Sequence, residues 1–193
     1  MKIIFATNNK NKVEEIKHLS HQKFQIFTLQ EVGIDIDIPE PHDTLEANAT
    51  EKSSTIYKLT NEAVFSEDTG LEVHALGGAP GVKSARYAGE GRNMQDNIDK
   101  LLQELKDKPS RAAQFRTVVS LIIGGKEYQF EGICKGHITH EMDGSNGFGY
   151  DPVFIPEGSN TTFANMDIAE KNKFSHRKKA VQQLIDFLND FQA

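Results

Sequence analysis

The sequence lacks the features that mark several large classes of protein. Among its 193 residues there are one cysteine, Cys134, and no tryptophan. A lone cysteine rules out an internal disulfide framework and a zinc site built on cysteines, and it is typical of a reducing compartment. The first apolar run, Lys2 to Ala6, is far too short for a signal-peptide core or a membrane span. We therefore expect a soluble, cytoplasmic protein with no membrane partner.

The sequence also lacks an excess of positive charge. It has 22 Lys and Arg residues against 28 Asp and Glu residues, a formal net charge of -6. Domains that bind a nucleic-acid backbone are usually basic, so we do not expect nucleic acid as a partner. The length suits a single domain over residues 1–193, of one or two lobes and with a substantial core.

The chain is organised around the stretch from Phe65 to Tyr87. An apolar run that ends at Phe65 leads into Ser66, Glu67 and Asp68, followed by Thr-Gly. Carboxylates at the end of a strand are a common place for a metal ion or an activated water. Taken alone, Glu-Asp-Thr-Gly is equally typical of a polar hairpin turn.

The N-terminal segment has the pattern of an anion-binding site. A strand over 2–6 leads into the polar loop 7–12, and a helix follows with Val13, Ile16 and Leu19 on one face. Backbone N–H groups and the helix dipole favour phosphate at such a point, although a plain capped helix start has the same pattern. The glycine spacing of a P-loop is absent from the sequence.

Two acidic segments follow. A second strand is expected over 24–29, and the alternation in 34–38 predicts a third, with its aspartates facing solvent. Glu40 lies between two prolines, which restrict its backbone as a metal ligand would require, but also as in an ordinary loop. Asp43 is expected to cap a helix to about residue 59, on which Asn48 and Lys52 share a face that could meet an anion.

The second half of the chain contributes further elements. We predict a helix over 94–106, a strand over 112–123, a Gly-Gly turn and a strand over 128–134. The loop 144–152 combines glycines with Phe148, Tyr150 and Asp151, which suits a stacked planar ring that is hydrogen-bonded at its edge. An aromatic-stapled loop would have the same composition.

A basic helix start completes the pattern. Ser175 is expected to cap a C-terminal helix, which places His176 and Arg177 in its first turn. Cations there oppose the helix dipole, so they are expected to face an anion or an electron-rich ligand, or else to form a solvated face. Carboxylates, scattered cations and an aromatic loop together indicate a nucleotide polyphosphate pocket with magnesium.

Five motifs occur in one order along the chain, and together they resemble a known family. They are Thr-Asn-Asn-Lys-Asn-Lys (7–12), Ser-Glu-Asp-Thr-Gly-Leu-Glu-Val (66–73), Leu-Gly-Gly-Ala-Pro-Gly-Val-Lys-Ser-Ala-Arg-Tyr (76–87), Gly-Phe-Gly-Tyr-Asp-Pro (147–152) and Glu-Lys-Asn-Lys-Phe-Ser-His-Arg (170–177). The chain resembles the noncanonical purine nucleoside triphosphate pyrophosphatases, the inosine/xanthosine triphosphate pyrophosphatase family. The resemblance implies an α/β fold with an elongated mixed β-sheet flanked by helices, and two lobes with a central substrate cleft. It also implies a homodimer.

The resemblance further implies an activity and its residues. The expected reaction is Mg2+-dependent hydrolysis of ITP, dITP and XTP to the monophosphate and pyrophosphate, by attack of water at the α-phosphorus. Glu40 and Asp68 match the metal ligands, and Asp68 also matches the general base. The implied substrate contacts are Thr7, Asn8, Asn9, Lys10, Asn11, Lys12, Lys52, Thr69, Phe148, Gly149, Tyr150, Asp151, Lys171, His176 and Arg177. Ser84, Arg86 and Tyr87 are expected near the substrate.

The chain departs from the family pattern at Met142-Asp143, Asn165 and Ala47, none of which is an implied contact. Three other functions compete with this one. A nucleotide sensor without turnover would be expected to lack Asp68 or Glu40. An aspartic protease half built on Asp68-Thr69-Gly70 gives the cations no purpose, and a nucleic-acid binder using 171–179 conflicts with the net acidity.

Overall fold

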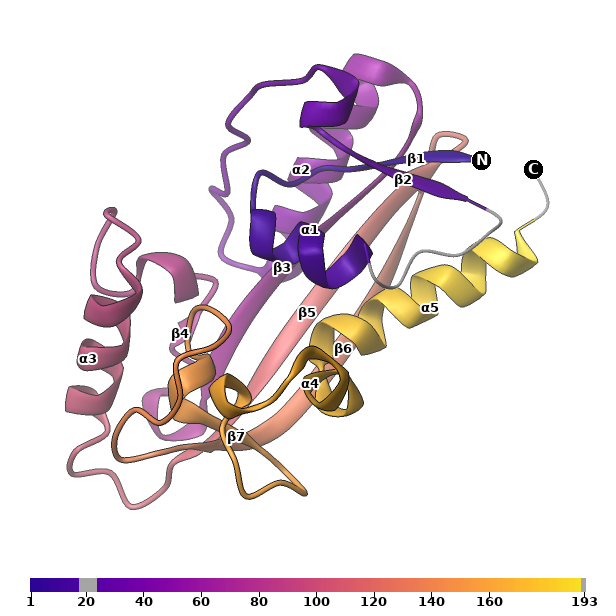
Figure 1. Ribbon diagram of the computed structural model, residues 1–193. Helices are drawn as coiled ribbons and strands as arrows, with labels where there is room; N and C mark the ends of the chain where they lie inside the picture. Colours follow the sequence, from indigo (N-terminus) through magenta and orange to yellow (C-terminus); the bar gives the residue numbers. More distant parts are fainter. Residues whose placement is uncertain (18–23, 192–193) are drawn as a thin grey trace. The chain divides into compact units, whose positions relative to one another are not determined.

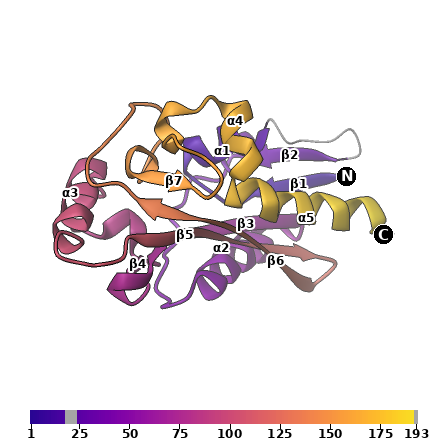
Figure 2. The same cartoon turned by 90° about the horizontal axis from the view of Figure 1, so that it is seen from below.

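The computed structural model of the chain describes residues 1–17 and 24–191 (Figures 1 and 2). In that part of the chain, the strands of the sheet are β1 (Lys2–Phe5), β2 (Gln25–Thr28), β3 (Ala63–Val73), β4 (Pro80–Gly81), β5 (Ala112–Ile123), β6 (Lys126–Ile138) and β7 (Phe154–Pro156). They pair in the order β2-β1-β3-β5-β6-β7, with β4 beside β3. β1 is parallel to β2 and β3, whereas β4 is antiparallel to β3 and β7 to β6. The predicted mixed α/β fold is confirmed.

Along the described chain, three α-helices lie between strands and two follow β7. The α-helices are α1 (Lys10–Lys17), α2 (Leu45–Thr60), α3 (Met94–Glu104), α4 (Ile168–Phe174) and α5 (His176–Asp190). Short 3-10 helices are η1 (Gln30–Val32), η2 (His74–Leu76), η3 (Ser84–Arg86), η4 (Asp151–Val153) and η5 (Phe163–Asn165). None of the helices in the described residues has both the length and the apolar character that crossing a bilayer requires.

The chain divides into two compact units. Unit 1 comprises Met1–Asp68, Thr117–Gly132 and Arg177–Ala193, and unit 2 comprises Thr69–Arg116 and Ile133–His176. The boundary therefore falls inside β3, β5 and β6, and between the first two residues of α5.

In unit 1, the strands separate two apolar layers. Ile3, Phe5 and Phe65 pack with Ile16 of α1 and with the apolar face of α5, while Ile4 and Val64 pack with Ile56 of α2. Successive side chains of a strand point to opposite faces, so this division follows from the alternation along β1 and β3. Figure 2 shows α2 on one side of these strands and α1 and α5 on the other.

Unit 2 has its own core, centred on aromatic rings. The Phe115 ring lies 4.7 Å from that of Phe154 in an edge-to-face arrangement and 6.1 Å from that of Phe163, and all three are buried. Edge-to-face pairs of this kind add about 0.5–1.5 kcal/mol to the burial of their area. Residues of β3, α3, β5 and β6 complete this cluster.

The Thr-Gly turn considered after Asp68 does not form, because β3 continues without a break from Ala63 to Val73. The glycine has another use. Gly70 lies in close contact with the backbone of β4, and a Cβ atom there would be 2.6 Å from the Gly81 carbonyl oxygen. Gly70 therefore lets β4 approach β3, next to the pairing of Leu71 with Gly81. The hairpin interpretation was wrong.

Other predicted elements are confirmed with small changes. Gly124 and Gly125 form the turn between β5 and β6, both with positive φ. The α2 cap is Thr44 rather than Asp43, since the Thr44 side chain accepts from the Ala47 N–H at 3.2 Å. The structure adds α4, which the sequence did not predict. Leu19, placed on the first helix by its periodicity, lies outside the described residues.

The strand predicted over 34–38 is wrong, because these described residues form no strand. Their alternation has a different cause. Ile34 and Ile36 pack against the core on the α2 side, and Ile38 is buried in it. The Ile36 carbonyl accepts a hydrogen bond from the Asn8 side chain at 2.8 Å instead of a ladder bond.

Candidate active site

The loop after β1 is built to begin a helix. The Asn9 Oδ1 atom accepts from the N–H groups of Asn11, at 3.0 Å, and Lys12, at 3.3 Å, which is the geometry of an N-cap. The Thr7 hydroxyl accepts from the Asn9 N–H at 3.2 Å and fixes the loop before the cap. The predicted helix start is therefore confirmed. Of the predicted substrate contacts in this segment, Asn8, Lys10 and Asn11 are exposed, whereas Thr7 and Lys12 are half-buried.

Lys52 joins two of the predicted site carboxylates. It extends from α2, and its Nζ atom lies 2.7 Å from Glu40 Oε1 and 3.0 Å from Asp68 Oδ1. Only 8% of the Lys52 side chain and 9% of the Asp68 side chain are exposed, against 25% for Glu40. The structure therefore brings together three residues that the sequence separates by up to 28 positions.

The charges of this triad shift one another. Burial works to lower the pKa of Lys52, but the Asp68 and Glu40 carboxylates outweigh it and raise that pKa. Burial raises the pKa of Asp68, and the nearby ammonium groups of Lys52 and Lys12 only partly offset this. A carboxylate with a raised pKa is a stronger base than an exposed aspartate, which suits proton abstraction.

Glu67, although adjacent to Asp68, belongs to a different cluster. Arg177 Nε donates to both carboxylate oxygens of Glu67, at 2.8 and 2.9 Å, and Lys12 Nζ lies 3.3 Å from Glu67 Oε1. Arg177 Nη1 also donates to Glu15 on α1. Because neighbouring side chains of a strand face opposite ways, β3 directs Asp68 toward α2 and Glu67 toward α1 and α5. This arrangement argues against a role for Glu67 in assisting Asp68.

In the second cluster, burial and the opposite charges act against each other on the pKa of each group. Burial works to raise the pKa of Glu67, but Arg177 and Lys12 outweigh it and lower that pKa. Burial lowers the pKa of Lys12, against the opposing effect of Glu67. Burial works to lower the pKa of Arg177, but Glu67 and Glu15 outweigh it and raise that pKa. Glu15 was missed from sequence, although it lies one helical turn from Lys12 and so on the same face of α1.

In unit 2, the aromatic loop is held by Asp151. Its Oδ2 atom accepts from the Phe148 N–H at 3.0 Å and from Lys171 Nζ at 2.7 Å. The same ammonium lies 5.3 Å from the centroid of the Phe148 ring and 5.4 Å from that of Phe163. Cation–π contacts of this length are attractive, so Lys171 is fixed by one carboxylate and two rings.

The remaining predicted contacts of unit 2 differ in exposure. Tyr150 is buried and donates through its hydroxyl to the Ser84 carbonyl at 2.9 Å, and Ser84 in turn donates to the Gly81 carbonyl at 2.6 Å. The ring of His176 is buried and stacks on Phe115, with centroids 4.7 Å apart. Thr69, Phe148 and Gly149 are half-buried. Ser84 and Tyr150 therefore connect the loop after β4 with the aromatic loop.

The two other residues expected near the substrate are Arg86, at the end of η3, and Tyr87, directly after it. Tyr87 donates from its hydroxyl to Glu104 of α3, and its ring lies 4.4 Å from Lys100 Nζ. Burial and Glu104 raise the pKa of Tyr87. Arg86 is half-buried. The structure thus gives Tyr87 a packing role against α3.

The carboxylate set can be tested for a metal ion. Within residues 1–17 and 24–191, no three His, Cys, Asp or Glu side chains converge as a metal cage. Glu40 and Asp68 supply two groups of oxygen donors. Mg2+ is commonly bound by one or two carboxylates, with water and substrate phosphates as its other ligands. The donor set therefore fits magnesium brought in with a polyphosphate.

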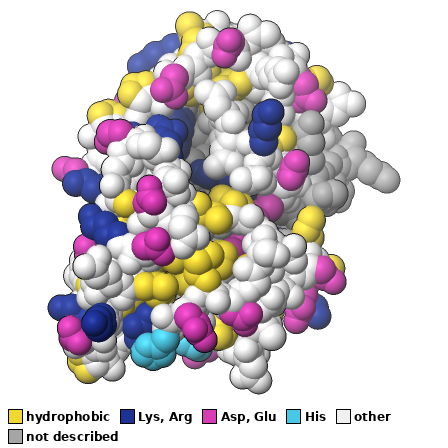
Figure 3. Space-filling model, turned by 60° about the vertical axis from the view of Figure 1, so that its left-hand side comes forward, with side chains coloured by type: hydrophobic (Ala, Val, Ile, Leu, Met, Phe, Trp, Pro, Cys, Tyr) yellow, Lys and Arg dark blue, Asp and Glu magenta, His cyan; other side chains and the backbone are white. Residues whose placement is uncertain are grey.

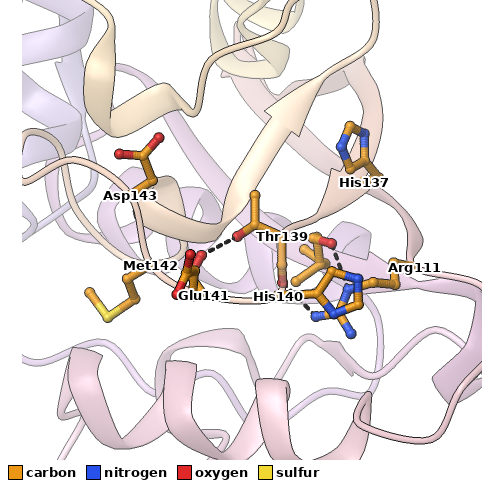
Figure 4. A pocket seen from close by; sticks show the side chains of 8 residues that line it. Arg111, His137, Thr139, His140, Glu141, Met142 and Asp143 are labelled. Atoms are coloured by element: carbon orange, nitrogen blue, oxygen red, sulfur yellow. Dashed lines mark hydrogen bonds between the residues drawn. The ribbon is translucent and has the colours of Figure 1, made fainter.

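A groove in unit 2 is lined by none of these predicted residues (Figure 4). Its volume is about 560 Å³, and its lining consists of Arg111 and residues 137–143. Arg111 donates to the backbone carbonyls of Leu105, Ile138 and Thr139, at 3.2, 2.7 and 2.5 Å. Arg111 lies at one end of the groove, and the departure from the family pattern, Met142-Asp143, lies at the other.

The charged surface bears on the choice of partner. On the face drawn in Figure 3, the described Lys and Arg side chains are interspersed with Asp and Glu. A nucleic-acid surface would instead be expected to gather Lys and Arg in one stripe.

Comparison with known proteins identifies the family. A sequence profile of the Ham1 family matches residues 3–187. The chain belongs to the Ham1 family. It is 50% identical over 188 residues to the dITP/XTP pyrophosphatase of Flavobacterium johnsoniae, covering 97% of this chain and 98% of that protein. It is 52% identical over 188 residues to the dITP/XTP pyrophosphatase of Porphyromonas gingivalis, covering 97% of each.

Solved Ham1 structures have the same fold. The Ham1 protein of Staphylococcus aureus is 37% identical, with a TM-score of 0.89 and 98% of each chain covered. The HAM1 protein of Coxiella burnetii is 33% identical, with a TM-score of 0.90 over 99% of this chain and all of that one. The resemblance predicted from the five motifs is confirmed by these matches.

Proposed function

We propose that the protein hydrolyses noncanonical purine nucleoside triphosphates, ITP, dITP and XTP, to nucleoside monophosphate and pyrophosphate, and so removes them from the nucleotide pool. The observation that carries the proposal is the triad of Glu40, Lys52 and Asp68, in which the buried Asp68 carboxylate, with a raised pKa, lies beside the ammonium group of Lys52. Support also comes from the relatives in the Ham1 family that are named dITP/XTP pyrophosphatases. In this proposal residues 1–193 act as a single catalytic domain.

Asp68 is the proposed general base. It accepts a proton from the water that attacks the α-phosphorus, and the bond from that phosphorus to the bridging oxygen of the pyrophosphate breaks. The raised pKa of Asp68 favours this transfer, and general-base catalysis typically contributes about 10²–10⁴-fold. Glu40 and Asp68 would hold Mg2+, which when bound neutralises phosphate charge.

The cations bind the triphosphate. Lys12 and Lys52 donate to phosphate oxygens and stabilise the charge that spreads over them, which is the main enzymatic contribution to phosphoryl transfer. The capped loop Thr7–Lys12 positions these contacts through backbone and side-chain groups, including Asn8, Asn9, Lys10 and Asn11. Glu67 holds Lys12 in place.

We propose that the purine base of the substrate binds to residues of unit 2 and of the start of α5. Phe148, Gly149, Tyr150 and Asp151 form the base-binding loop, with Thr69 and Lys171 as further contacts. His176 and Arg177 donate to the keto oxygen at position six. Adenine carries an amino group there, so it would leave donors unpaired, at about 1–3 kcal/mol for each buried group.

A product assay tests this function. The protein is incubated with ITP, dITP, XTP, GTP and ATP plus Mg2+, in water enriched in ¹⁸O, and pyrophosphate and orthophosphate are measured separately. We expect pyrophosphate as the first product, with the label in the monophosphate. Orthophosphate first, or label in pyrophosphate, would contradict attack at the α-phosphorus. Turnover of ATP as fast as ITP would refute the base assignment, and binding without turnover would favour a nucleotide sensor.

The predicted homodimer and cytoplasmic location belong to the same proposal. Light scattering during gel filtration measures the mass, and twice the 21.6 kDa of one chain is the expected value. A mass of one chain at micromolar concentration would contradict the dimer.

A further inference from the structure

Lys52 uses the same two carboxylates that the proposed metal would require. Its Nζ atom bridges Glu40 Oε1, at 2.7 Å, and Asp68 Oδ1, at 3.0 Å. The Lys52 side chain is largely buried, so this ion pair is shielded from solvent. An ammonium group that bridges two carboxylates at hydrogen-bond distance occupies acceptor positions that a divalent cation would also need.

We propose that Lys52 competes with the divalent cation for Glu40 and Asp68, and that the triphosphate releases it. This inference rests on the proposed function and on its metal ligands. Two cations that share the same oxygen atoms repel each other, so the metal gains its ligands only where Lys52 moves away. The lysine side chain is a flexible four-carbon stem with a compact charge, which allows that movement.

Phosphate oxygens supply the alternative partner for the ammonium. Without nucleotide, Lys52 would lose two carboxylate contacts, the one to Asp68 buried, and gain no new anionic partner, so displacing it is costly. With a bound triphosphate it exchanges carboxylate oxygens for phosphate oxygens. Metal and nucleotide should therefore bind cooperatively, and the coupling must be reciprocal.

Binding of Mn2+ in the absence of turnover tests the competition. The affinity is measured by electron paramagnetic resonance at pH 8, without nucleotide and then with a non-hydrolysable α,β-methylene analogue of ITP. Lys52→Met removes the ammonium and keeps most of the side-chain volume. Lys58→Met is the matched control, because Lys58 is an exposed lysine on the same helix.

We expect Lys52→Met to bind free Mn2+ at least about tenfold more tightly than the unmodified protein, which corresponds to about 1.4 kcal/mol. The gain in Mn2+ affinity on adding the analogue should be smaller in this variant. Lys58→Met should match the unmodified protein, and Lys52→Arg, which keeps the charge, should bind free Mn2+ as weakly. Lys52→Gln replaces Lys52→Met in the same titration if the latter does not fold.

Equal or weaker binding of free Mn2+ by Lys52→Met would overturn the inference, since Lys52 would then only organise the carboxylates. Asp68→Asn distinguishes this from a failure of the proposed function. If Asp68→Asn leaves Mn2+ binding unchanged, the metal assignment itself is wrong. If it abolishes binding while Lys52→Met binds no more tightly, only the competition is wrong.

Discussion

Arg177 Nε donates to both carboxylate oxygens of Glu67, at 2.8 and 2.9 Å, and only 3% and 0% of the two side chains are exposed. This ion pair explains why a cation occupies the first turn of α5, where the helix dipole disfavours it. The anion predicted to face the basic helix start includes a carboxylate of the protein itself. Glu67 thereby joins β3 to α5, and through Lys12 it also joins β3 to α1.

Removal of Glu67 should destabilise the fold strongly. Breaking one partner out of a buried ion pair typically costs about 3–5 kcal/mol, because the other charge stays buried without compensation. We expect Glu67→Ala to lower the free energy of unfolding by that amount in urea denaturation. Glu14→Ala removes an exposed carboxylate from the neighbouring helix α1 and should change it by less than about 0.5 kcal/mol. A small loss for Glu67→Ala would show that the pair contributes little.

The same carboxylate should make stability depend on pH in the acidic range. The pKa of Glu67 is lowered in the folded protein from its usual value of 4.5, despite burial, by Arg177 and Lys12. Its contribution is therefore fully present above pH 4.5 and is lost as the pH falls through the lowered folded value. The difference in unfolding free energy between the unmodified protein and Glu67→Gln should shrink in that range, by up to about 1.4 kcal/mol per pH unit. A difference that is constant with pH would contradict this assignment.

Asp68 should control turnover rather than folding. Asp68→Asn removes the proposed base while keeping the shape of the side chain, and kcat for ITP should fall about 10²–10⁴-fold. Steady-state release of pyrophosphate measures the rate, and circular dichroism confirms the fold. Asp107→Asn, at an exposed aspartate after α3, is the control and should keep full activity. Near-normal turnover by Asp68→Asn would remove Asp68 from the mechanism.

Gly147 should be required for the shape of the aromatic loop. It has a φ of +77°, and a Cβ atom there would lie 2.1 Å from the Asp151 carboxylate oxygen that holds Phe148 and Lys171. Gly158 also has a positive φ, of +87°, but its nearest neighbour would be 3.8 Å away. Both alanine variants should lose about 1–2 kcal/mol of stability to backbone strain.

The clash of the Gly147→Ala side chain with Asp151 should also weaken substrate binding, which backbone strain alone would not do. We expect Gly147→Ala to raise the KM for ITP at least about tenfold, whereas Gly158→Ala should leave it unchanged. Equal KM values for the two variants would show that the position of the Asp151 carboxylate does not depend on the space beside Gly147.

The motifs and most elements could be predicted because they are local. The alternation in 112–123, the two glycines after it and the polar loop 7–12 each predict their structure from neighbouring residues alone. The polar loop's cap illustrates this, since Asn9 bonds only to residues two and three positions ahead. In 34–38 the alternation of apolar residues reflects packing against the core on the α2 side and not pairing in the sheet, so the predicted strand was wrong.

Pairing between distant charges could not be predicted in this way. Glu67 and Asp68 are adjacent in sequence and chemically alike, but the continuous β3 strand turns them to opposite faces. Glu15 gave a signal only through its spacing from Lys12, and that spacing does not reveal that Arg177 lies beside it. Those partners depend on which helix covers which side of the strand.

By itself, the sequence determined the family, the mixed α/β class and the residue types of the site, because these are carried by motifs of fixed order. Only the tertiary structure decided how the charges pair. It placed Lys52 between Glu40 and Asp68, and it assigned Glu67 to Arg177 and Lys12. The physical reason is that a charge buried among apolar layers must find its partner in three dimensions, from whichever elements pack against its strand.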